Sequence, residues 1–196
     1  MKAASGCVCE ATRDEEETGL RSPGESPLPP PPILVLGLGN ELLKDDAVGI
    51  RVAERLAAVF PDEVEVQSTA LFGLALLDSF VDRDKVLLID SYVPENFGLS
   101  KIREISVSAM VEAGAPSPHF VGLGEIIEIM RTLEIGFPRQ VRILAIPVLD
   151  PVTFSSEMSF EVQAQVGKAV QRASRIVLGW IAQERNGRDT QRSGRT

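Results

Sequence analysis

Ile33-Leu34-Val35-Leu36-Gly37-Leu38-Gly39-Asn40 is the stretch of this sequence that most directly predicts the fold. Its first four residues are continuously apolar, which is typical of a parallel strand covered by helices on both faces. Two glycines follow, and from Asp46 to Phe60 the apolar residues Val48, Val52, Leu56 and Val59 recur at helical spacing. The stretch therefore predicts a buried strand, a glycine turn and a helix.

The same change of period recurs along the rest of the chain. Further strands are expected at residues 63–66, 86–89, 100–107 and 141–146, and further helices at residues 71–80, 123–133 and 162–177. We expect the strand over residues 86–89 to stop at Asp90, and the strand over residues 100–107 to lie at an edge of the sheet. Such alternation predicts an α/β fold, a three-layer sandwich whose mostly parallel, twisted sheet of about five strands has helices on both faces.

The two ends of the chain differ in composition from the middle. Residues 1–32 are acidic and end in Pro-Leu-Pro-Pro-Pro-Pro, and a segment of this kind buries too little apolar surface to offset its ordering entropy. We therefore expect a disordered leader over residues 1–32, a single α/β domain over residues 33–183 and a flexible tail over residues 184–196. Cys7 and Cys9 lie in the leader, where they predict neither a disulfide framework nor a complete zinc site.

The charge of the predicted domain limits its partners. Residues 33–183 carry thirteen Lys and Arg against twenty Asp and Glu, and the whole chain has a formal charge of -8. This balance argues against a nucleic-acid partner, because phosphate binding requires basic surfaces. No apolar run approaches the roughly 20 residues of a membrane span, and the first residues do not resemble a signal peptide. We expect a cytoplasmic monomer with no membrane partner.

Three polar positions are candidates for a functional site. Ligands of open α/β sheets bind beyond the carboxyl ends of the strands, and Asp45, Asp46 and Asp90 follow predicted strands. His119 is the only histidine and follows two prolines in Pro116-Ser117-Pro118-His119. Two carboxylates and an imidazole on converging loops form a donor set that suits a borderline divalent metal such as nickel or zinc.

Each position also has a purely structural interpretation. Asp45 or Asp46 can cap the following helix, which is worth about 1 kcal/mol, but one cap suffices and leaves the other aspartate to point elsewhere. Asp90 can serve as a cap or an ion pair near the end of its strand, since an unpaired buried charge is costly. A solitary histidine such as His119 is more often structural or exposed than functional.

Other site chemistries fit the sequence less well. Leu42 stands where a dinucleotide-binding fingerprint requires its third glycine, and the aspartate pair would repel a pyrophosphate at the helix start. A cysteine–histidine pair would need a cysteine from the leader. A serine triad would have to use His119, and no Gly-x-Ser-x-Gly turn follows a predicted strand.

Four motifs, in order, resemble those of the hydrogenase maturation proteases. They are Ile33–Asn40 with Asp45-Asp46-Ala47-Val48-Gly49, then Leu87-Leu88-Ile89-Asp90, then Ser117-Pro118-His119 with Gly122-Leu123, and finally Ile146-Pro147 with Asp150-Pro151. The resemblance spans residues 33–180, which is nearly all of the predicted domain. One departure is Gln67-Ser68-Thr69-Ala70, where members of this family often have a Gly-Gly-Thr-like turn close to the presumed substrate groove.

The resemblance implies a function. It implies an aspartic-type endopeptidase that removes a short C-terminal extension from the nickel-loaded precursor of a NiFe hydrogenase large subunit. It also implies that Asp46, Asp90 and His119 contact the nickel of that precursor, with no metal or other cofactor of the protein's own. Asp46 is the candidate general base, and metal polarisation of the scissile carbonyl would assist hydrolysis. A non-catalytic chaperone that holds the same precursor is the alternative.

Overall fold

The computed structural model describes residues 31–60, 64–94, 101–107, 119 and 122–193, with side chains described up to Asn186. Five strands form one sheet: β1 (Ile33–Leu38), β2 (Glu65–Thr69), β3 (Lys85–Tyr92), β4 (Arg103–Ser106) and β5 (Gln140–Pro147). The helices are α1 (Val48–Ala57), the 3-10 helix η1 (Gly73–Leu76), α2 (Leu77–Phe80), α4 (Leu123–Thr132) and α5 (Phe160–Ser193). The strand order is β2-β1-β3-β5-β4, and only β4 is antiparallel to its neighbour.

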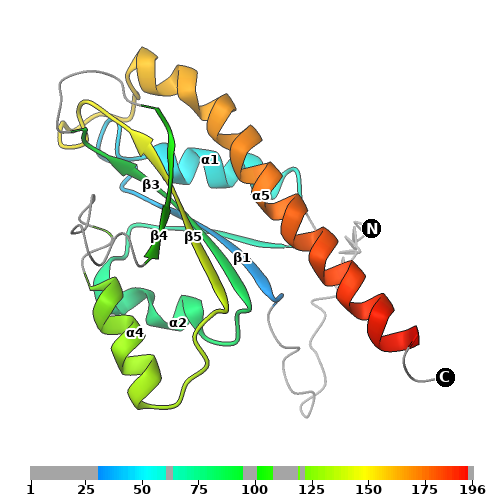
Figure 1. Ribbon diagram of the computed structural model, residues 1–196. Coiled ribbons are helices and arrows are strands. Elements are labelled where there is room, and N and C mark those ends of the chain that lie inside the picture. The colour runs from blue at the N-terminus through cyan, green and yellow to red at the C-terminus, as the bar shows by residue number, and fades with distance from the viewer. Residues whose placement is uncertain (1–30, 61–63, 95–100, 108–118, 120–121, 194–196) are drawn as a thin grey trace, which may run out of the picture.

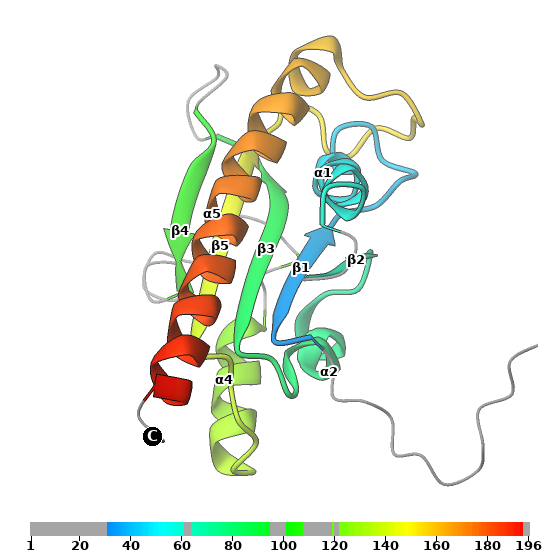
Figure 2. The same cartoon turned by 90° about the vertical axis from the view of Figure 1, so that its right-hand side faces the viewer.

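Helices cover both faces of this sheet, which confirms the predicted three-layer α/β fold. Figures 1 and 2 show α1 and α5 on one face, and α2 and α4 on the other. Each face has its own apolar core: Val52, Leu56 and Val166 belong to the first, and Phe80 and Ile126 to the second. The inner strands β1 and β3 are buried along their whole length, as expected for parallel strands between two helical layers.

Several boundaries differ from the prediction. β3 continues through Asp90 to Tyr92, so that Asp90 lies inside a buried strand instead of ending it. The helix expected over residues 71–80 is a 3-10 turn followed by the short α2. Val59 and Leu133, which the apolar spacing assigns to helix faces, are both exposed because α1 ends at Ala57 and α4 at Thr132.

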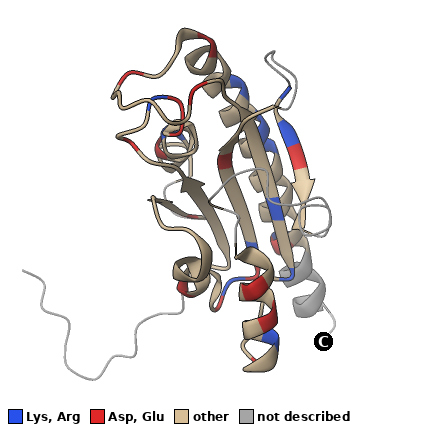
Figure 3. Ribbon diagram, turned by 90° about the vertical axis from the view of Figure 1, so that its left-hand side faces the viewer, with Lys and Arg blue, Asp and Glu red and all other residues tan. Residues whose placement is uncertain are grey.

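The structure describes the residues at both ends of the predicted domain, Ile33 and Gln183. β1 begins at Ile33, and residues 1–30, which make up most of the predicted leader, lie outside the described residues. α5 continues past Gln183 to Ser193, and Glu184 forms an ion pair with Lys85. Within the described ranges, none of the helices combines the length and apolar character needed to cross a membrane. Charged residues of both signs lie along the helices and loops, while the inner strands are largely uncharged (Figure 3).

Candidate functional site

The order of the strands determines where a site can form. The chain leaves β1 through α1 toward β2 on one side, whereas β3 lies on the other side of β1. At such a switch point the connections leave in opposite directions, and a crevice forms beyond the carboxyl ends of the two central strands. Asp46 follows β1, and Asp90 lies near the carboxyl end of β3.

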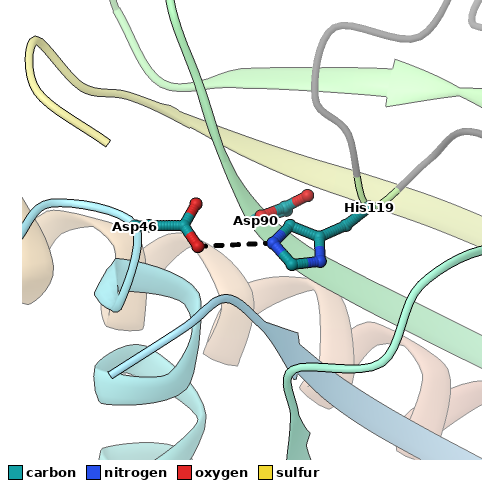
Figure 4. A group of neighbouring side chains, drawn as sticks. All are labelled: Asp46, Asp90 and His119. Carbon is teal, nitrogen blue, oxygen red and sulfur yellow. Dashed lines mark hydrogen bonds and ion pairs between the residues drawn. The ribbon is translucent and has the colours of Figure 1, made fainter. Parts of the chain in front are cut away.

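Asp46, Asp90 and His119 meet at this point of the fold (Figure 4). One oxygen or nitrogen donor from each residue lies within 4.8 Å of the others. The Nε2 atom of His119 is 3.3 Å from Oδ2 of Asp46. All three side chains are largely shielded from solvent. The structure thus brings together the three residues selected from the sequence, although they are 44 and 29 positions apart along the chain.

Glycines allow α1 to begin close to the sheet and so position Asp46. A Cβ atom at Gly49 would lie 2.2 Å from the carbonyl oxygen of Leu38 and 2.4 Å from that of Ile89. Gly39 has a φ of +150°, and a Cβ atom added to it would lie 2.1 Å from the carbonyl oxygen of Asp46. The glycine pattern that resembles a nucleotide fingerprint therefore serves a close approach of helix to strands.

Asp45 has a different role from its neighbour. Its side chain is fully buried and accepts hydrogen bonds from the backbone N–H of Ser159 at 2.7 Å and of Asp150 at 3.2 Å. Ala47, not an aspartate, stands at the N-cap of α1, so the capping interpretation is wrong for both acids. Asp45 instead joins the loop after β1 to the loop after β5, which fixes the backbone next to Asp46.

Ser91 is a residue of the site that the sequence did not single out. Its hydroxyl donates to Oδ1 of Asp46 at 2.9 Å, and its backbone N–H donates to Oδ1 of Asp90 at 2.7 Å. It therefore orients both carboxylates. A strand that ended at Asp90, as the sequence predicts, would have placed Ser91 in a loop. The polar pair Asp90-Ser91 after an apolar run was the available signal.

The three groups alter one another's protonation. Burial raises the pKa of Asp46, but hydrogen bonds from His119 and Ser91 outweigh it and hold this pKa below its ordinary value. Burial lowers the pKa of His119, yet the hydrogen bond to Asp46 and the negative charges of Asp90 and Asp46 raise it more, so the net shift is upward. The site thus favours positive charge, whether a proton on His119 or a metal cation.

The donor set has the chemistry of a metal site with open positions. Carboxylate oxygens and one imidazole nitrogen accept a borderline divalent ion, and three protein donors leave positions for donors from another molecule. Two acidic groups at this distance also provide a proton acceptor beside such an ion. The arrangement is therefore suited to metal-assisted hydrolysis.

Known proteins with related sequences are named for hydrogenase maturation or for hydrogenase expression and formation. The chain is 32% identical over 119 residues to the hydrogenase 2 maturation protease of Escherichia coli strain K12, covering 58% of this chain and 71% of that protein. It is 25% identical over 161 residues to the hydrogenase expression/formation protein HupD of Rhizobium leguminosarum bv. viciae, covering 79% of each chain. A comparison with models of known families gave no match.

The chain belongs to the hydrogenase maturation proteases. It is accordingly a peptidase, a processing endopeptidase of this family. The hydrogenase-maturating endopeptidase HybD of E. coli has the same fold, with a TM-score of 0.61 and 26% identity over 72% of this chain and 88% of that chain. HybD of Thermococcus kodakarensis also shares the fold, with a TM-score of 0.57 and 24% identity over 74% and 97% of the two chains.

Proposed function

We propose that this maturation protease removes a C-terminal extension from the nickel-loaded precursor of a NiFe hydrogenase large subunit. The convergence of Asp46, Asp90 and His119 on one point, with their donor atoms within 4.8 Å, is the observation that carries the proposal. Nickel arrives with the precursor and is part of the substrate. Within this proposal the protein acts in the cytoplasm as a monomer and holds no metal of its own.

Recognition of nickel would make cleavage depend on completed metal insertion. The cluster supplies two oxygen donors and one nitrogen donor, which nickel accepts. Its two acids attract the cation, and Ser91 holds both in place. A precursor without nickel presents no cation to this pair of acids and binds less tightly. The protease would thereby distinguish finished precursors from unfinished ones.

Asp46 is the proposed general base. The lowered pKa of Asp46 keeps its carboxylate ionised at neutral pH, so that it is able to accept a proton. Polarisation of the scissile carbonyl by the precursor's nickel would make the peptide carbon more electrophilic. Water then adds to that carbon as its proton passes to Asp46, and Asp46 returns this proton to the leaving amine as the peptide bond breaks.

The test compares cleavage by the wild type and by Asp46→Ala on nickel-loaded precursor, followed by mass spectrometry. We expect the wild type to shorten the precursor and Asp46→Ala to leave its mass unchanged. Asp78→Ala, which removes an exposed acid from α2, is the matched control and should cleave normally. Equal processing by Asp46→Ala would end the proposal for this residue. Binding of the precursor without any change in its mass, by the wild type as well, would favour the chaperone alternative.

A further inference from the structure

Large apolar side chains are exposed around the candidate site. Among the described residues, those on the segments that follow β1, β2 and β5, the start of η1 included, are Leu42, Leu71, Phe72, Leu74, Val152 and Phe154. Phe154 is 82% exposed, Val152 75% and Phe72 64%. Single exposed apolar residues are common on proteins, but a group of them at one edge usually marks an interaction surface.

The loop that carries Val152 and Phe154 is held firmly in place. Leu43 and Phe154 form an antiparallel bridge, flanked by hydrogen bonds from Lys44 N–H to Thr153 and from Ser155 N–H to Leu42. Asp45 adds its two hydrogen bonds to the same loop, and Lys44 pairs with Asp150 at 3.3 Å. The loop that carries these exposed apolar side chains is therefore hydrogen-bonded to the segment that directly precedes Asp46.

The second group lies on the other side of the cluster, next to His119. The backbone of Leu71 lies close enough to the imidazole of His119 to help raise its pKa. Gly122, three residues after His119, packs so closely on Gly73 that an added Cβ would lie 2.9 Å from its Cα atom. Leu71, Phe72 and Leu74 are thus tied to the histidine side, as Val152 and Phe154 are tied to the aspartate side.

The position of these apolar residues on both sides of the cluster indicates which protein contacts them, if the proposed function holds. The three donors are buried, so nickel bound to a protein reaches them only when that protein's surface lies against the surrounding loops. Any such client must cover the exposed apolar groups on both sides. Contacts of this kind require apolar side chains on the client around its metal, because burial of apolar area supplies the main driving force for association.

We propose that Val152 and Phe154, together with Leu71, Phe72 and Leu74, form the docking surface for an apolar region of the precursor next to its nickel. The inference rests on the proposed function. It separates two tasks: the cluster selects the metal, and the two apolar loops supply affinity for the protein that carries it. Loss of the loops should weaken binding without removing the ability to cut.

The experiment measures the affinity of the full-length protein for nickel-loaded large-subunit precursor, with cleavage followed in parallel. The double variant Val152→Ser/Phe154→Ser and the single variant Phe72→Ser should each bind about tenfold more weakly, and at saturating precursor they should cleave at nearly the wild-type rate. The matched control is Leu133→Ser/Leu178→Ser, because those side chains are 62% and 55% exposed but lie on α4's end and on α5. The control should bind like the wild type.

Each outcome has a distinct meaning. Wild-type affinity of the two loop variants would overturn the docking surface while leaving the proposed function intact. Binding of the nickel-loaded precursor by the wild type with no change in the precursor's mass would overturn the proposed function, and the affinity measurements would still judge the loops. Sedimentation of the wild type and of the double variant tests whether a second copy of this chain binds the docking surface. A wild-type dimer that Val152→Ser/Phe154→Ser dissociates would overturn the proposal in favour of self-association.

Discussion

Asp45 and Asp46 are adjacent in the chain, yet their side chains contact different parts of the molecule. Asp45 points into the loop after β5 and accepts two backbone hydrogen bonds. Asp46 points into the cluster and contacts Ser91 and His119. The sequence indicated that one of the two would be free for a site. Only the family resemblance selected Asp46, because the separation of the pair into two roles depends on a loop more than 100 positions away.

Substitution of Asp45 should mainly reduce stability, whereas substitution of Asp46 should mainly reduce cleavage. Asp45→Ala removes the acceptor for two backbone N–H groups, so we expect the free energy of unfolding to fall by about 1–3 kcal/mol per unsatisfied group. Asp46→Ala should change this free energy less, since it also relieves the crowding of two buried acids, but it should abolish cleavage. Urea unfolding beside the cleavage assay measures both. An equal loss of stability in the two variants would contradict the division of roles.

The protonation of His119 offers a direct measurement, because it is the only histidine in the chain. Its raised pKa should appear in an NMR titration as a midpoint above the ordinary value of about 6.5. Asp46→Asn should lower that midpoint. Since the folded pKa is the higher one, the His119–Asp46 pair stabilises fully below about pH 6.5 and loses this contribution as the pH rises through the folded pKa. A midpoint unchanged by Asp46→Asn would show that the pair does not form.

At the scale of elements, the close contact between α1 and the two central strands positions the cluster. Val48 begins α1 directly after Asp46 and Ala47, and Gly49 faces the carbonyl oxygens of Leu38 and Ile89. Any shift of the start of this helix would move Asp46 relative to Asp90. The geometry of the site is therefore set by backbone packing as much as by the polar side chains themselves.

Gly49→Ala should accordingly damage both stability and activity. The added methyl group would overlap two backbone carbonyl groups, which cannot move like a flexible side chain, and we expect a cost of about 1–3 kcal/mol. Gly167→Ala in α5 is the control: its methyl group would meet nothing within 4 Å, and the variant should be more stable by about 0.5–1 kcal/mol. Thermal unfolding and precursor cleavage measure the two effects. Wild-type behaviour of Gly49→Ala would contradict this account of the packing.

The sequence predicted the elements well and their ends less well. The apolar runs of β1 and β3 identified buried parallel strands because both faces of each are covered. The predicted end of β3 was wrong because Asp90 and Ser91 are polar but remain in the strand, where each contributes to the cluster. The helix expected from Leu71 was also wrong at its start, because Gly73 has a φ of 57° and the first helical turn, η1, begins only there.

At the scale of the whole molecule, the length of α5 determines where the folded unit ends. Trp180 and Ile181 are buried against the core, and Glu184 one turn later pairs with the buried Lys85 at 2.5 Å. Composition indicated a boundary near Gln183, because the residues after it are rich in Arg, Gly and Ser. It could not reveal a partner for Lys85, which is 99 positions away from Glu184 in the chain.

Truncation of α5 should show where the folded unit ends. A chain that stops after Gln183 lacks Glu184 and leaves Lys85 buried without its carboxylate, so we expect unfolding to become easier by about 1–3 kcal/mol. A chain that stops after Asn186 keeps the pair and should resemble the full-length protein. Fluorescence of Trp180, the only tryptophan, reports the unfolding of both. Equal stability of the two truncated chains would show that the ion pair contributes little.

The central claim is that Asp46, Asp90 and His119 together hold the precursor's nickel. The most direct measurement is the affinity of the wild type and of His119→Gln for two forms of the same large-subunit precursor, one nickel-loaded and one nickel-free. The wild type should bind the loaded form more tightly, and His119→Gln should lose most of that preference while retaining its affinity for the nickel-free form. Equal affinity of the wild type for the two forms would contradict the claim.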